Sequence, residues 1–542
     1  MAGFSTRYTV AAAAVCGLLC LALIVCVWWT GPVPQIVFGH DVMVLLEGGW
    51  KWKWGFRPHT DYYSPFGALT FLLVALGIDL TGSLVQALPA ATCIVAALAL
   101  PMALYGTFSR LHPIAAFAAT ILLIAAAVTP HELRFDSTVW SYAAVYNRWA
   151  YALFGVAIVT IALRPTMAWS RRDWADGLIA GACVMSLIFL KISYGLLAAA
   201  IFIGFAPFRR RSAGYWLGAL LSGVLVVLFV GLLLRWGFSL LLADMQIASK
   251  ARHGLDAAQF LKWAGSLRSD LVALSSLAAL WFICGVVFGR AAIICRFINA
   301  LLLLGGFGVS AAAILMTNSP LGGLQESPVT GLGALVFLGG ILSDCWNKRL
   351  TEDWRRVAVA VVTCAAAAAL ALFVVAPVTG RDLKSISEAA RFKANKSSLL
   401  PLETFQTGPL QGLQIKDFGG DPPLPTTYVG KVNDGLELLA RTGNSHRSVA
   451  ALDFANAFNV ARGVKASRTA PTVWQLGFVF SATSAPALDR VFNGEDVIMI
   501  PVRFGDGNQG NITVIRQLYG AYLDERYVLA GESEQWQLLV PK

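Results

Sequence analysis

The chain has 542 residues, of which 57% are hydrophobic and only 13% are charged. Soluble globular domains carry about 25% charged residues, and the mean hydropathy of this chain is +0.65. Apolar runs of about 17–25 residues recur along the sequence, as membrane-spanning helices require. The composition therefore excludes a soluble enzyme and predicts a polytopic α-helical membrane protein.

The formal charge of +11 does not indicate nucleic-acid binding. From residue 379 on, 17 Lys or Arg balance 16 Asp or Glu, so the positive excess lies in the membrane part. Loop cations of such proteins usually reflect topology. The nine cysteines fall in or beside apolar runs, none follows Cys364, and no Cys-x-x-Cys exists. We therefore expect neither a disulfide in the tail nor a cysteine metal site.

Eleven membrane spans are expected, with the N-terminus inside. They lie near 9–29, 82–106, 112–129, 149–164, 176–190, 194–207, 216–235, 271–289, 297–316, 329–345 and 358–377. The first is interpreted as a permanent helix, because no small-residue cleavage site follows a short apolar core. The shorter run at 66–80 is interpreted as a helix at the membrane interface. With this assignment Lys and Arg are denser in the inside loops, and the tail lies outside.

Two domains are predicted: a membrane domain at 1–378, with outer juxtamembrane helices within 30–81, and a soluble outer domain at 379–542. The patterns in the second domain mix helical and strand periodicity, which is typical of a small α/β domain. Its expected elements are helices at 433–442 and 515–524, strands at 448–454 and 496–502, and a closing hairpin of 527–530 and 535–540.

The stretch after the first span carries the first candidate catalytic residue. His40 and Asp41 stand about a dozen residues beyond Trp29, where the first apolar helix is expected to end. A carboxylate beside the membrane can accept a proton from an attacking hydroxyl group. Asp41 is therefore a candidate general base. The alternative is that Asp41 only caps a helix at 42–50, because Asp is a preferred N-cap residue.

A second acid, Asp61, lies in the aromatic segment Trp50–Gly67, which reads WKWKWGFRPHTDYYSPFG. Its Pro and Gly residues favour turns, aromatic faces suit sugar rings, and tyrosine hydroxyls can hydrogen-bond them. The alternative for the aromatic side chains is an interfacial belt. The candidate substrate contacts of this region are His40, His59, Tyr62 and Tyr63.

Cations expected at the same membrane face could bind a phosphate group. Lys191 lies between two apolar half-spans, where an ionisable group is costly, and Arg148 stands where the fourth span begins. Arg can hold phosphate oxygens with a fork of donors. The alternatives are that Lys191 extends to the headgroups and that Arg148 anchors its helix at the interface. Lys51 and Lys53 alternate with tryptophans, which favours anchoring.

Several of these motifs resemble the GT-C superfamily of integral membrane glycosyltransferases. The similarity rests on an Asp at the start of the first outer loop and on the pattern Gly-x-x-Pro-x-x-Asp-Tyr, here Gly55–Tyr62, followed by Gly67. Two shorter segments are also similar to the family: Tyr146-Asn147-Arg148 and FLKISYG at 189–195. One departure is Val42, because many relatives have a second acid after the first. The pattern covers roughly residues 10–210.

The resemblance implies a polyprenyl-phosphate-linked sugar as donor, Asp41 as general base and inversion at the sugar carbon. Catalysis is then expected at Asp41 and Asp61, and donor phosphate binding at Arg57, Arg148 and Lys191. Further substrate contacts are expected at Tyr146, Asn147 and Tyr194. The loops at 236–270 and 317–328 could line the same pocket.

The expected function is transfer of the sugar to a hydroxyl of an envelope glycan, lipid or protein at the outer face of a bacterial cytoplasmic membrane. The alternatives are a transporter or flippase for lipid-linked glycans, and a non-catalytic envelope assembly subunit. A transporter predicts charges along a path through the spans, whereas the spans here are nearly free of charge. No cofactor is expected. A divalent cation at His40, Asp41, His59 and Asp61 stays open, although their spacing fits no ligand template.

Overall fold

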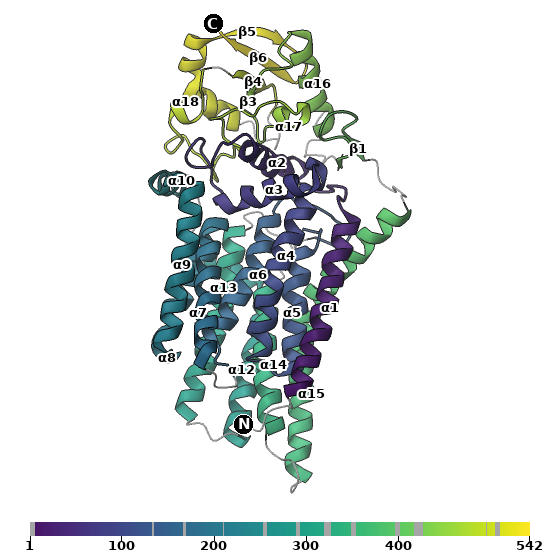
Figure 1. Ribbon diagram of the computed structural model, residues 1–542, viewed down its shortest axis with the longest axis vertical. Coiled ribbons are helices and arrows are strands. Elements are labelled where there is room, and N and C mark those ends of the chain that lie inside the picture. The colour runs from purple at the N-terminus through teal and green to yellow at the C-terminus, as the bar shows by residue number, and fades with distance from the viewer. Residues whose placement is uncertain are drawn as a thin grey trace.

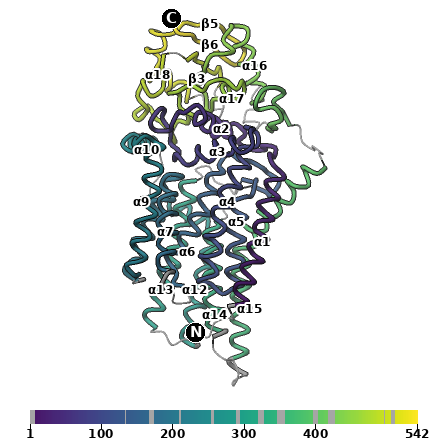
Figure 2. The backbone as a smooth tube through the Cα atoms, in the orientation of Figure 1, coloured from purple at the N-terminus to yellow at the C-terminus, as the bar shows by residue number. Residues whose placement is uncertain are grey.

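The computed structural model describes residues 6–132, 135–165, 170–209, 211–252, 257–288, 293–318, 327–347, 354–395, 402–416, 427–494, 496–503 and 510–542. The molecule is elongated, with a helical bundle at one end and a small mixed domain stacked on the other (Figure 1). We call residues 402–542 the tail domain. The backbone trace (Figure 2) places the N-terminal region at the far end of the bundle from the C-terminus.

The first 395 residues are almost entirely helical, as the apolar runs predict. The helices are α1 (Thr6–Thr30), α2 (Gly39–Lys53), α3 (Ala68–Thr81), α4 (Leu84–Phe108), α5 (Pro113–Val128), α6 (Val145–Ala162), α7 (Ser170–Leu190), α8 (Ile192–Arg209), α9 (Ala213–Leu233), α10 (Phe238–Ala251), α11 (Ala257–Ser266), α12 (Arg268–Phe288), α13 (Ile293–Asn318), α14 (Pro328–Asn347) and α15 (Trp354–Asn395).

Nine helices of the described part of the chain are long and apolar enough to cross a membrane. They coincide with nine of the eleven predicted spans. The other two predicted spans correspond to the shorter apolar helices α5 and α8. The third short apolar helix, α3, lies beside α2 between the bundle and the tail domain (Figure 1), where an interfacial helix was expected. The prediction of a polytopic helical membrane protein is confirmed.

Small residues allow the closest helix packing in the bundle. A Cβ at Gly177 would lie 2.0 Å from the carbonyl oxygen of Tyr215, and one at Gly181 would lie 2.2 Å from that of Ala219. Helices α7 and α9 therefore approach backbone to backbone, as small-residue interfaces in membranes permit. A larger side chain at either glycine would force these two helices apart.

The tail domain is a small α/β domain, as predicted. Its sheet has the strand order β3-β4-β6-β5, in which β3 and β4 are parallel and the other pairs are antiparallel. The strands are β3 (Val449–Ala451), β4 (Val497–Pro501), β5 (Tyr527–Glu532) and β6 (Trp536–Pro541), and the helices are α16 (Tyr428–Arg441), α17 (Phe458–Arg462) and α18 (Gly510–Arg526). Each element expected from the sequence is present within a few residues of its expected bounds.

Two features at the junction were not expected. Helix α15 continues past residue 378 to Asn395, where the Lys393 ammonium donates to the carbonyl of Thr30 at 3.1 Å. A short hairpin of β1 (Glu403–Thr404) and β2 (Gln414–Ile415) begins the tail domain. The backbone N–H of Gln35 donates to Gln414 at 2.8 Å. The loop after α1 is thereby attached to the tail domain through backbone hydrogen bonds.

Candidate active site at the tail-domain end of the bundle

Five of the predicted site residues come together where the bundle meets the tail domain. The Lys191 ammonium, at the corner between α7 and α8, donates to the side-chain oxygens of Asn147 on α6 and Asn318 at the end of α13. It also lies 5.3 Å from the ring centroid of Tyr146 and 5.2 Å from that of Tyr194. The Tyr194 hydroxyl accepts a hydrogen bond from Asn318 at 2.7 Å. We call this cluster, with Arg148, the basic site.

The corner that carries Lys191 is fixed by close backbone packing. Helix α7 ends at Leu190 and α8 begins at Ile192, so Lys191 interrupts two apolar helices. A Cβ at Gly67 would lie 2.1 Å from the carbonyl oxygen of Phe189. The loop before α3 therefore rests directly on the corner, and only glycine allows this approach.

Arg148, in the first turn of α6, is 1% exposed. Its guanidinium donates to the carbonyl of His131 and, at 2.8 Å, to that of Ser141. Its Nε has no hydrogen-bond partner among the described residues. Arg148 therefore holds His131 and Ser141, on either side of the loop between α5 and α6, and it shares with Lys191 the charge of Glu132.

Sequence reasoning missed the residues that this loop and α15 contribute. Glu132 is 7% exposed, and its charge acts on both Arg148 and Lys191. His131 Nδ1 lies 2.7 Å from Thr129 Oγ1 and 3.7 Å from Asp382 Oδ1. Burial, with the nearby Arg148 second, lowers the pKa of His131 to about 3, so this imidazole is neutral. Glu132 is a single acid in a short loop, and the sequence around it does not indicate that its charge acts on Arg148 and Lys191.

Arg252 adds a third cation from the end of α10. Its guanidinium donates to the carbonyl of Thr317 at 2.7 Å, one residue before Asn318. Burial lowers the pKa of the Lys191 ammonium well below its usual range, and the charge of Arg252 acts in the same direction. Three basic side chains, Lys191, Arg148 and Arg252, thus stand with two acids, Glu132 and Asp382, in a partly enclosed site. Such a site favours the binding of an anion.

Asp41 lies outside the basic site, in the first turn of α2. The N-cap position belongs to Phe38, which has a left-handed φ of 52°, and no side chain caps the helix. The alternative that Asp41 is an N-cap residue is therefore wrong. Asp41 Oδ1 lies 3.1 Å from His40 Nε2, and 33% of the Asp41 side chain is exposed. The helix N-terminus favours its negative charge.

The segment 139–142 connects Asp41 with the basic site. Just before α2, the backbone N–H of Ile36 donates to the carbonyl of Trp140 at 2.8 Å. The Gln35 side-chain oxygen accepts from the N–H of Tyr142, also at 2.8 Å. Since Ser141 in this segment is a partner of Arg148, the start of α2 and the basic site share one supporting loop.

Asp61 is engaged by other groups. One carboxylate oxygen accepts from the N–H of Arg57 at 2.8 Å, and the other from Arg468 of the tail domain at 3.0 Å. Arg235 Nη1 lies 3.6 Å away, and only 1% of the Asp61 side chain is exposed. The Arg57 guanidinium lies over the ring of Trp52 at 4.4 Å. Asp61 and Arg57 therefore shape a loop on which the tail domain docks.

The remaining predicted residues also lie in this docking loop. His59 Nδ1 is 3.0 Å from Asp244 Oδ2 on α10, and Arg490 of the tail domain donates to the other Asp244 oxygen at 2.8 Å. The Tyr63 hydroxyl donates to the carbonyl of Val479 in the tail domain. Tyr62 is fully buried. The structure thus separates the predicted residues into the basic site, the docking loop, and the pair of His40 and Asp41 at the start of α2.

Two buried ionisable residues on α2 complete the docking surface. Glu47 and Lys51 are both fully buried. Asn459 of the tail domain donates to Glu47 at 3.2 Å, and Lys51 donates to the carbonyl of Ser467. Burial raises the pKa of Glu47 to about 7, although Lys51 opposes this shift. Burial also lowers the pKa of Lys51 to about 8, against the effect of Glu47.

These two shifts predict the pH dependence of stability at the docking surface. Between pH 4.5 and 7 the folded chain binds more protons at Glu47, so the free energy of unfolding falls as pH rises. Between pH 8 and 10.5 the unfolded chain binds more protons at Lys51, so it rises again. We expect the double variant Glu47→Gln with Lys51→Met to lose both slopes. Thermal unfolding of both proteins from pH 4.5 to 10 measures this; a constant difference would contradict it.

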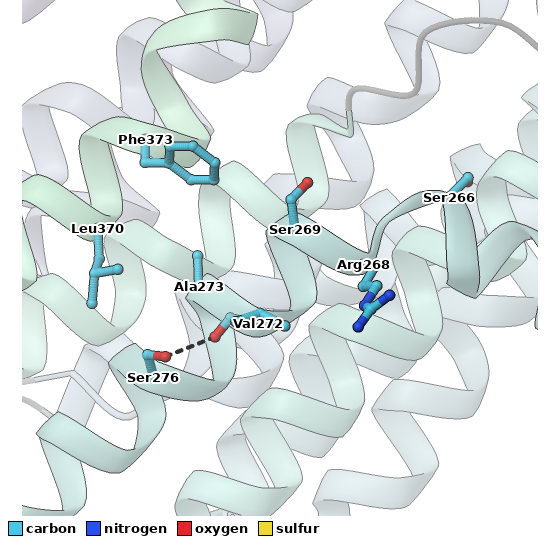
Figure 3. A pocket seen from close by; sticks show the side chains of 8 residues that line it. All are labelled: Ser266, Arg268, Ser269, Val272, Ala273, Ser276, Leu370 and Phe373. Atoms are coloured by element: carbon cyan, nitrogen blue, oxygen red, sulfur yellow. Dashed lines mark hydrogen bonds between the residues drawn. The ribbon is translucent and has the colours of Figure 1, made fainter.

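A groove on the membrane-facing side lies between α12 and α15, with a volume of 680 Å³. Leu370 and Phe373 of α15 line one side, and Arg268 lies at the opposite side (Figure 3). Val272 and Phe373 are each 59% exposed. Near Arg268, Asp270 accepts a hydrogen bond from Thr330 at 2.7 Å, which connects the groove to the start of α14.

A divalent cation bound by His40, Asp41, His59 and Asp61 would require these four side chains to lie close together. His40 and Asp41 lie under the tail domain, whereas His59 is paired with Asp244 and Asp61 with Arg468. Within the described ranges, no group of three His, Cys, Asp or Glu side chains could hold a metal ion. His40 and Asp41 therefore form one pair, whereas His59 and Asp61 each have a different partner.

The sequence matches no protein-family profile and no curated protein. Among solved structures, the chain is similar to ArnT from Cupriavidus metallidurans bound to undecaprenyl phosphate, with 12% identity, a TM-score of 0.46, and coverage of 99% of this chain and 98% of that chain. For the same protein in the apo state the values are 13%, 0.40, 96% and 97%. Likeness at this level does not assign a function.

Proposed function

We propose that this protein is a GT-C-type glycosyltransferase that takes a sugar from a polyprenyl phosphate and passes it to a hydroxyl group at the outer membrane face. The observation that carries the proposal is the basic site. This site contains the basic side chains Lys191, Arg148 and Arg252. The charge of one acid, Glu132, acts on both Arg148 and Lys191. The basic site lies at the end of apolar helices, where the phosphate of a lipid can enter while its chain stays in the membrane.

The groove between α12 and α15 suits the chain of such a lipid. Its walls are mainly apolar, and it lies along membrane-spanning helices. About two and a half turns beyond Phe373, the same helix α15 carries Asp382, which lies 3.7 Å from His131. A hydrocarbon chain in the groove would therefore lead toward the basic site.

We propose the following roles in the reaction from the charges and positions of these residues. An acceptor hydroxyl gives its proton to Asp41 while its oxygen bonds to the sugar carbon and the bond from that carbon to the phosphate oxygen breaks. The phosphate that departs gains negative charge, which Lys191 stabilises most directly because its ammonium is held at the centre of the site by Asn147 and Asn318. Attack opposite to the leaving phosphate inverts the sugar carbon. The proposal assigns no step to a metal ion or another cofactor.

Asp41 is a better base than Asp61 in this arrangement. One third of the Asp41 side chain is exposed, and the partner found for it is His40. Asp61 is enclosed and accepts hydrogen bonds from Arg57 and Arg468. We therefore propose that Asp61 positions the docking loop. The proposal also keeps the tail domain outside a bacterial cytoplasmic membrane.

Binding and transfer measurements on the purified protein in lipid nanodiscs test the function. We expect saturable binding of undecaprenyl phosphate and much weaker binding of undecaprenol, which has the same chain without the phosphate. With synthetic polyprenyl-phosphate sugars, we expect release of polyprenyl phosphate that requires the protein. Equal binding of the phosphate and the alcohol would contradict the proposal.

A further inference from the structure

Two aromatic residues of the tail domain lie against the imidazole beside the proposed base. The ring centroids of His40 and Phe454 are 4.7 Å apart and the rings meet edge to face, at 86°. Tyr428, the first residue of α16, lies 6.1 Å from His40 and at 52° to it. Phe454 is 5% exposed. The imidazole is therefore held between α2 and the tail domain.

The position of Phe454 is fixed by the core of the tail domain. Its backbone N–H donates to Asp453 at 2.9 Å, and its carbonyl accepts from the N–H of Trp474 at 3.0 Å. Asp453 forms a nearly buried ion pair with Lys431 of α16 at 2.6 Å. The Lys431 ammonium also donates to the carbonyl of Arg503 at 2.7 Å. Phe454 thus cannot shift without disturbing the packing of α16 on the sheet.

The imidazole in turn limits the motion of the carboxylate. An exposed Asp side chain in a first helical turn can rotate about both of its side-chain torsions. In the structure, His40 Nε2 lies 3.1 Å from Asp41 Oδ1, an ion-pair contact without hydrogen-bond geometry. The proposed acceptor of the substrate proton is the other oxygen, Oδ2. A base held in one orientation loses less freedom when the hydroxyl attacks.

We propose that the tail domain completes the catalytic centre: Phe454 and Tyr428 position His40, and His40 positions the carboxylate of Asp41. This inference rests on the proposed glycosyltransferase function. It makes His40 a positioning residue and places the acceptor between the first turns of α2 and α16. The membrane domain alone then binds the donor, but transfers its sugar slowly.

A double-mutant cycle on the full-length protein tests this proposal. We expect Phe454→Ala and His40→Asn each to lower kcat about tenfold to a hundredfold, and the double variant to fall no further than the larger single effect. Binding of undecaprenyl phosphate should stay unchanged, because the basic site is intact. Phe454→Tyr, which keeps the ring, should retain kcat.

The control is Phe478→Ala, since Phe478 is a partly exposed phenylalanine of the same domain. It should leave kcat unchanged. Effects of Phe454 and His40 that multiply in the double variant, or an unchanged kcat in Phe454→Ala, would overturn the proposal while wild-type transfer still supports the function. Absence of wild-type transfer, by contrast, would reject the function itself. Thermal unfolding of Phe454→Ala and Phe454→Tyr separates misfolding from mispositioning.

Discussion

Replacing Lys191 with methionine is expected to lower sugar transfer by about 10²–10³-fold, the loss typical of removing one donor to a developing negative charge. Binding of undecaprenyl phosphate should weaken strongly as well, because the Lys191 ammonium is the group around which the basic site is built. Equilibrium binding in nanodiscs and initial transfer rates measure the two effects. The hydrogen bond from Asn318 to Tyr194 does not involve the ammonium, so we expect it to remain in the variant.

The same substitution should leave the protein equally stable or more stable. Lys191 lies among amide oxygens and tyrosine rings, and burial without a directly bonded carboxylate disfavours its charge. A side chain that costs stability but is required for activity is typical of a functional site. Lys53→Met is the matched control, since this lysine is 36% exposed and pairs with Asp79. Undiminished lipid binding in Lys191→Met would contradict the assignment.

The basic site could be predicted because its residues violate the pattern around them. Lys191 interrupts apolar helices, and Tyr146, Asn147 and Arg148 are polar residues at the start of an apolar span. A charged group in such a place needs partners, so its importance is visible without knowledge of the fold. The partners themselves, Glu132, His131 and Asp382, come from a loop and from a distant helix. Only the packing of α5, α6 and α15 brings them together.

The docking loop shows the opposite case. Asp61 and His59 stand in a segment rich in aromatics and turns, where the sequence suggests a substrate site. Their partners Arg468 and Arg490 follow more than 400 residues later in the chain. No local sequence pattern predicts that the carboxylate of Asp61 will be covered by the tail domain. For the same reason the hairpin at 402–416 and the extension of α15 were not expected, because both are stabilised by contacts with the end of α1 and the loop that follows it.

Exchanging Asp41 for Asn is expected to lower transfer by about 10²–10⁴-fold, the contribution typical of a general base. Asn has nearly the shape of Asp but cannot accept the proton. Binding of undecaprenyl phosphate should remain, because Asp41 lies outside the basic site. Stability should change little, since an acid in a first helical turn contributes about 0.3–1 kcal/mol. Transfer rates, lipid binding and thermal unfolding measured on the same preparation separate these three effects.

Asp61→Asn is the matched comparison, because it makes the same chemical change at the other acid. Its partners Arg235 and Arg468 are 57% and 60% exposed, so solvent screens the lost charge and the cost should be modest. We expect looser docking of the tail domain, seen as faster proteolysis near residues 402–416, and a loss of transfer well below that of Asp41→Asn. If Asp61→Asn abolished transfer while Asp41→Asn remained active, the base would have to be sought at the docking loop, and the roles proposed for the two acids would be reversed.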